Sequence, residues 1–169
     1  MNQLTVFRIL TFILVPVAIL FCILDLFMLL LALSANPAML LIVFAMACFV
    51  IYVFTSVRFL LQGIGNERQL NASLKDWIKV NAYGTLFISV MFLMNSAAAF
   101  FINDVNLRQM LGEMIEQQPD VSGKISLDYF VKIFRVISGI MFFVSLMAIA
   151  HVLINFKLIR RYEHLFGKE

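Results

Sequence analysis

The stretch Ile9–Leu33, ILTFILVPVAILFCILDLFMLLLAL, decides the fold. It is apolar almost throughout and carries a single formal charge, Asp25. A helix needs roughly 20 such residues to cross a bilayer, so the stretch predicts a membrane-spanning helix with one carboxyl group inside the hydrocarbon. Its small and polar residues recur on one line at helical spacing: Thr11, Ala18, Cys22, Asp25 and Ala32. We expect that line to face other helices and not lipid.

The composition of the whole chain points to the same class of protein. Of its 169 residues, 63% are hydrophobic and 14% are charged, whereas about a quarter of the residues of a soluble domain are charged. The sequence therefore predicts an integral membrane protein. Four apolar stretches use most of the chain, so we expect a single membrane domain over residues 1–169.

The predicted architecture is an all-α, antiparallel, left-handed bundle of four transmembrane helices. Small and polar residues at spacings of three and four favour left-handed packing. The helices are expected at about residues 5–33, 38–61, 74–102 and 127–165. Ser73 is expected to cap the third helix, and Gly63 and Gly65 to mark the break after the second. The outer loop, residues 103–126, is expected to contain a short amphipathic helix at the membrane surface.

Lysine and arginine residues indicate the orientation. Nine lie beside the end of the spans that is nearer the termini: Arg8, Arg58, Arg68, Lys75, Lys79, Lys157, Arg160, Arg161 and Lys168. Four lie beside the opposite end: Arg108, Lys124, Lys132 and Arg135. The excess predicts that both termini are cytoplasmic. We expect the inner membrane of a bacterium. The net charge of +3 reflects this clustering at membrane edges, and we expect no nucleic-acid partner.

Two polar layers are the candidate sites. Asp25 and Asn95 are each about four residues outward of the centre of their helices, and we expect them to form an outer layer with Arg135 above it. Asp25 could hold a proton or a cation, or it could fix helix packing through a hydrogen bond. A second layer is expected in the cytoplasmic half: Thr55, Arg58, Asn81, His151 and Asn155, together with Thr11. His151 could relay protons or serve only in packing.

Spacing weakens several enzyme and cofactor hypotheses. His151 and His164 lie 13 residues apart on one helix, about 20 Å along its axis, so one chain cannot clamp haem between them. The cysteines, Cys22 and Cys48, form no Cys-x-x-Cys pair, and no cluster of three or four zinc ligands occurs in the sequence. We therefore expect no cofactor, no metal and no enzymatic activity.

Two functions remain. The first is an accessory or regulatory component that acts through contacts with lipid, with a second copy of the chain or with another membrane protein. The alternative is a small proton-coupled transporter or channel that uses Asp25. A continuous polar path from Asp25 to His151 would support the alternative, whereas a tightly packed interior would count against it.

Overall fold

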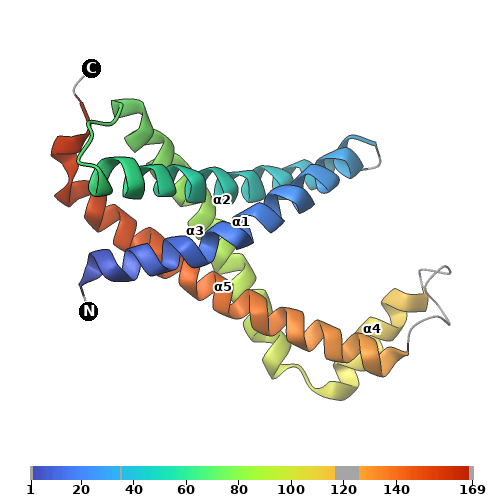
Figure 1. The fold of residues 1–169 in the computed structure, drawn as a ribbon. Coiled ribbons are helices and arrows are strands. Elements are labelled where there is room, and N and C mark those ends of the chain that lie inside the picture. The colour runs from blue at the N-terminus through green and yellow to red at the C-terminus, as the bar shows by residue number, and fades with distance from the viewer. Residues whose placement is uncertain (1, 35, 117–125, 168–169) are drawn as a thin grey trace. The chain divides into compact units, whose positions relative to one another are not determined.

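The described part of the chain is almost entirely helical. The computed structural model describes residues 2–34, 36–116 and 126–167, and it contains no β-strand in these ranges. Figure 1 shows the elements in chain order: α1 (Gln3–Ser34), η1 (Pro37–Met39), α2 (Leu40–Arg58), η2 (Phe59–Gly65), α3 (Ala72–Phe101), α4 (Asp104–Glu116), α5 (Leu127–Arg161) and η3 (Glu163–Leu165).

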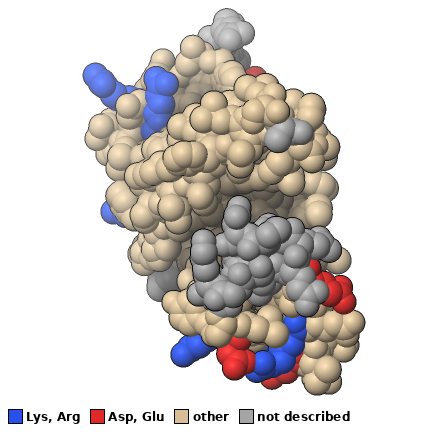
Figure 2. Space-filling view, turned by 90° about the vertical axis from the view of Figure 1, so that its right-hand side faces the viewer, with Lys and Arg blue, Asp and Glu red and all other residues tan. Residues whose placement is uncertain are grey.

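Four segments are long and apolar enough to cross a membrane. They are Gln3–Ser34, Pro37–Gly65, Ala72–Phe101 and Leu127–Arg161. Many large apolar side chains on them are exposed, and most of the surface in Figure 2 belongs to uncharged residues. This arrangement suits a surface in contact with hydrocarbon. The prediction of an all-helical chain with four such helices is confirmed.

The described residues form two compact units. The first is built from residues of 1–90 and 146–169, and the second from residues of 91–145. The helices α3 and α5 contribute residues to both units. The predicted single membrane domain and its left-handed bundle geometry stay predictions.

The core of the first unit is packed around small side chains. The helices α1 and α2 contact each other, and Leu14 and Ala18 of α1 are fully buried. Gly84 of α3 lies against Cys48 of α2, because a Cβ atom at position 84 would stand 2.7 Å from the Cys48 Cβ atom. The Thr85 hydroxyl donates to the Asn81 carbonyl oxygen at 2.8 Å. Small residues thus allow α2 and α3 to approach closely, as they do in other membrane helix pairs.

One end of the first unit is closed by the connection after α2 and by the C-terminal strap, residues 162–167. Helix η2 is a π-helix that includes Gly63, where a Cβ atom would stand 2.6 Å from Leu70 Cδ1. The Leu70 amide donates to the Leu165 carbonyl oxygen at 2.7 Å. The Phe166 ring stacks on Phe59 with 5.4 Å between centroids. Backbone and ring contacts therefore hold the strap on the connection.

The second unit is held by polar contacts at its helix ends. Arg135 of α5 donates to the carbonyl oxygens of Ala99 and Ile102 at 2.9 and 3.3 Å, and it pairs with Asp104 at 2.5 Å. These bonds satisfy carbonyl groups at the end of α3 that have no partner within the helix. The helix α4 buries Leu107 and Leu111, which are four residues apart. Its placement at a membrane surface stays a prediction.

Several helix ends differ from the predicted ones. Helix α3 begins at Ala72, and the Asn71 side chain accepts from the Ser73 amide at 3.2 Å. The expected cap at Ser73 was therefore wrong, because Asn71 is also a good capping residue and stands two positions earlier. The glycines after α2 do not break the helix at residue 61, because the helix continues to Gly65 as a π-helix. Helix α5 ends at Arg161 and not at residue 165.

Candidate functional site

Three pairs of residues, each four apart on its own helix, meet inside the first unit. They are Phe7 and Thr11 on α1, Tyr52 and Ser56 on α2, and His151 and Asn155 on α5. Residues four apart lie on the same face of a helix, so each helix presents one pair to the other two. All six residues are at most 1% exposed. Thr11, Tyr52, Ser56, His151 and Asn155 are called the buried polar chain below.

The donor and the acceptor of each hydrogen bond in the buried polar chain can be assigned. The Thr11 hydroxyl donates to the Phe7 carbonyl oxygen at 2.7 Å. Its single hydrogen is thereby used, so at its 2.9 Å contact with His151 Nε2 the Thr11 oxygen must accept. A neutral imidazole with Nε2–H accepts at Nδ1, and the Tyr52 hydroxyl lies 2.7 Å from that atom. Tyr52 therefore donates to His151, and the geometry assigns the Nε2–H tautomer.

The Asn155 amide completes the chain. Its Nδ2 group donates to the Tyr52 hydroxyl oxygen at 3.2 Å and to Ser56 Oγ at 2.9 Å. The Tyr52 hydroxyl thus accepts one bond and donates another, which makes it the central member. The Asn155 Oδ1 atom is buried and has no hydrogen-bond partner among the described residues. The chain therefore ends at this oxygen without a donor.

The arrangement of His151 leaves it no free ring nitrogen. Both nitrogens are hydrogen-bonded, and the Phe7 ring stacks on the imidazole with 4.6 Å between centroids and an interplanar angle of 19°. Within the described ranges, no group of three or more His, Cys, Asp or Glu side chains could hold a metal. In this arrangement His151 joins three helices and has no nitrogen left for a ligand.

The structure brings together part of the predicted cytoplasmic layer. Thr11, His151 and Asn155 are in contact through the buried polar chain. Arg58 is exposed and donates to Gln62. Thr55 and Asn81 bond to carbonyl oxygens of their own helices: Ile51 and Tyr52 for Thr55, and Trp77 for Asn81.

Sequence reasoning missed two partners of His151 and Asn155, namely Tyr52 and Ser56. A signal for them was present, because Tyr52 and Ser56 repeat the four-residue spacing of His151 and Asn155 at the same end of a helix that runs in the same direction. The predicted layer contains Thr55 and Arg58 of α2 instead. Thr55 bonds to carbonyl oxygens of its own helix, and Arg58 is exposed.

The residues of the predicted outer layer fall in different units. Asp25 belongs to the first unit and is half-buried, whereas Asn95 belongs to the second and is exposed. Arg135 bonds to Asp104 and to two carbonyl groups of its own unit. The Oδ1 atom of Asp25 is buried and has no hydrogen-bond partner in the described part of the chain. The outer layer as such stays a prediction.

A scan against protein-family models, a search of curated proteins and a search of solved structures each found no match for this chain.

Proposed function

We propose that this chain is a polytopic membrane protein without a catalytic site that acts as an accessory or regulatory component. In this proposal the outer half of α1, Phe21–Ser34, binds a transmembrane helix of another polypeptide. That helix would present a hydrogen-bond donor to Asp25.

The unpartnered carboxyl oxygen of Asp25 carries this proposal. A carboxylate near the bilayer centre costs about 2.5 to 3.5 kcal/mol on insertion scales, and here Oδ1 has no donor among the described residues to offset that cost. The large side chains around it are exposed and apolar: Ile23, Leu24, Leu26, Phe27, Leu30, Leu31 and Leu33. A donor from a second membrane helix would satisfy the carboxyl group and cover part of this surface.

The transport alternative receives less support from the same residues. Asp25 is 14 residues from Thr11 along α1, which is about 21 Å at 1.5 Å per residue. Between them α1 offers one polar side chain, the Cys22 thiol. The buried polar chain is at most 1% exposed, and five cavities of the described ranges are lined by other residues. A relay of protons from Asp25 to His151 would therefore need a path that α1 does not supply.

We also propose an orientation with both termini in the cytoplasm of a bacterium, where the protein would reside in the inner membrane. Ends of three segments line one cavity of the first unit, which supports a common side for them: Leu4 at the start of the first span, Glu67 after the second and His164 after the last. The lysine and arginine excess favours the cytoplasm for that side. Reporter fusions at both termini, one active only in the cytoplasm and one only outside it, test this orientation.

The experiment on the proposed function compares Asp25→Leu with Phe27→Leu in the full-length chain. Both changes lie on the same helix, but only the first removes the unpartnered carboxyl group. Cys22 lies three residues before Asp25 and is partly exposed, so oxidation in membranes links two copies if a second copy is the partner. Co-isolation from the native membrane, read separately for each variant, detects a different partner.

The expected result is that Asp25→Leu loses the linked dimer, or one specific co-isolated membrane protein, while Phe27→Leu retains it. Equal association in the two variants would refute the proposal. Proton flux in liposomes that is present in the wild type and absent in Asp25→Asn would favour the transport alternative instead.

A further inference from the structure

We propose that a cavity at the end of α2 binds the phosphate of an anionic phospholipid headgroup. The cavity has a volume of about 350 Å³ and is lined by Arg58, Gln62, Arg68, Gln69, Leu70 and Asn71. Ligand sites commonly have volumes of about 300 to 1,000 Å³. The arginines are its only charged lining residues.

The two arginines have charge available for a ligand. Within the described ranges neither Arg58 nor Arg68 forms an ion pair with a carboxylate, although three other basic residues do. Glu67, the acidic residue next to Arg68, lines a different cavity. A guanidinium group without a carboxylate can bind a phosphate through two parallel hydrogen bonds.

Gln62 positions both arginines. Its side-chain oxygen accepts from Arg58 Nε at 3.0 Å, which leaves the two terminal nitrogen atoms of Arg58 available as donors. Its carbonyl oxygen accepts from the Arg68 amide at 3.2 Å. Gln62 thus connects the end of α2 with the segment that carries Arg68. A site held in this way loses less side-chain entropy on binding than two free surface arginines would.

The backbone around the cavity is tightly fixed. Leu70 is buried and contacts Gly63 so closely that no larger residue fits there without a shift. The Asn71 side chain caps α3. The wall of the cavity is therefore built by packing and capping contacts, as preorganised sites require.

The depth of Arg58 favours a lipid over a free phosphate. Arg58 is 18 residues beyond Leu40, the first residue of α2, which corresponds to about 27 Å of helix. The hydrocarbon core of a bilayer is about 30 Å thick, so a helix that enters at one surface brings Arg58 to the headgroups of the other. Ile51 and Phe54 lie seven and four residues earlier on the same face of α2 and are exposed. An acyl chain can lie along them while the phosphate contacts the arginines.

The test is native mass spectrometry of the full-length protein in detergent, titrated with phosphatidylglycerol or with phosphatidylcholine. Arg58→Gln/Arg68→Gln removes the two site charges. Arg160→Gln/Arg161→Gln removes two exposed charges at the end of α5 and is the matched control. Gln62→Leu keeps every charge but removes the side-chain acceptor that positions Arg58. Inorganic phosphate, added alone, tests whether the site binds free phosphate instead of a lipid headgroup.

We expect the wild type to retain phosphatidylglycerol in preference to phosphatidylcholine. The site variant should lose at least about tenfold more affinity than the control, because it removes charge-assisted hydrogen bonds to the phosphate; tenfold corresponds to about 1.4 kcal/mol. Gln62→Leu should weaken binding without any change in net charge. Equal losses in the site and control variants would overturn the proposal, because they would indicate general attraction of basic residues. Binding of inorganic phosphate without retention of phosphatidylglycerol would also overturn the assignment to a lipid.

Discussion

The substitution Tyr52→Phe tests the buried polar chain most directly. It removes one oxygen atom, which donates to His151 Nδ1 and accepts from Asn155 Nδ2. It leaves both groups fully buried without that partner. Hydrogen bonds between membrane helices contribute about 0.6 kcal/mol on average and at most about 1.7 kcal/mol. The loss of two such bonds should therefore lower the free energy of unfolding by about 1 to 3 kcal/mol.

The assay is reversible unfolding in mixed detergent and dodecyl sulfate, followed by the fluorescence of Trp77, the single tryptophan of the chain. Tyr83→Phe is the matched control, because Tyr83 is 66% exposed and the same atom is removed there from the surface. The control should change the free energy of unfolding by less than about 0.5 kcal/mol. If Tyr52→Phe destabilises the protein no more than Tyr83→Phe does, the hydrogen-bond assignment is refuted.

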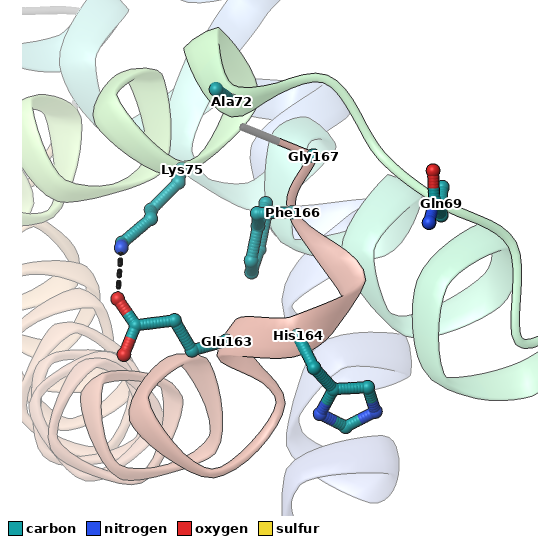
Figure 3. A pocket seen from close by; sticks show the side chains of 7 residues that line it. All are labelled: Gln69, Ala72, Lys75, Glu163, His164, Phe166 and Gly167. Atoms are coloured by element: carbon teal, nitrogen blue, oxygen red, sulfur yellow. Dashed lines mark hydrogen bonds and ion pairs between the residues drawn. The ribbon is translucent and has the colours of Figure 1, made fainter. Parts of the chain in front are cut away.

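Three further predictions concern packing, pH and a helix end. Gly84→Ala should lower the free energy of unfolding by about 1 to 3 kcal/mol, because the new Cβ atom would stand 2.7 Å from the Cys48 Cβ atom. In a double-mutant cycle followed by thermal unfolding, Cys48→Gly should restore much of this stability. Lys75, which lies 2.5 Å from Glu163 and points toward it (Figure 3), lowers the pKa of that carboxyl group. The pair should therefore stabilise the C-terminal strap at neutral pH, and this contribution should be lost as the pH falls through the lowered pKa. The protection factors of the strap amides, corrected for the intrinsic exchange rate at each pH, should fall in acid in the wild type but not in Glu163→Gln. Arg135→Leu should speed hydrogen exchange in the last turn of α3, because it removes both donors to the carbonyl groups there.

The coarse fold follows from the sequence because one physical rule dominates it. A backbone in hydrocarbon must satisfy its own hydrogen bonds, so four long apolar stretches predict four helices. Local exceptions were harder to predict. A glycine pair usually ends a helix, yet Gly63 lies inside a π-helix, because Leu70 packs against the surface that a side chain at position 63 would occupy. That contact comes from a segment seven residues later and leaves no periodic signal.

The candidate site was predicted only in part, for a related reason. The polar residues of each helix can be read from the sequence, but their rotation about the helix axis is set by packing partners. Tyr52 and Thr55 are three positions apart, which is less than one helical turn. Tyr52 is fully buried, whereas the Thr55 hydroxyl bonds to its own helix. Periodicity within one helix could not select between them, whereas the matching spacing of His151 and Asn155 on α5 does.

A series of contacts between aromatic side chains joins the buried polar chain to the C-terminal strap. His151 stacks on Phe7, Phe7 meets Phe59 edge to face at 6.5 Å between centroids, and Phe59 stacks on Phe166. These four rings come from α5, α1, η2 and the strap, so the interior of the first unit is tied to its end by packing. Asp25 lies outside this series, and its Oδ1 atom has no hydrogen-bond partner among the residues that the structure describes. A polar group that is satisfied within the chain stabilises the fold, whereas an unsatisfied one in hydrocarbon favours the binding of whatever supplies its donor. By that criterion the hydrogen-bonded members Thr11, Tyr52 and His151 belong to the architecture, and the proposed partner would gain the most at the surface around Asp25.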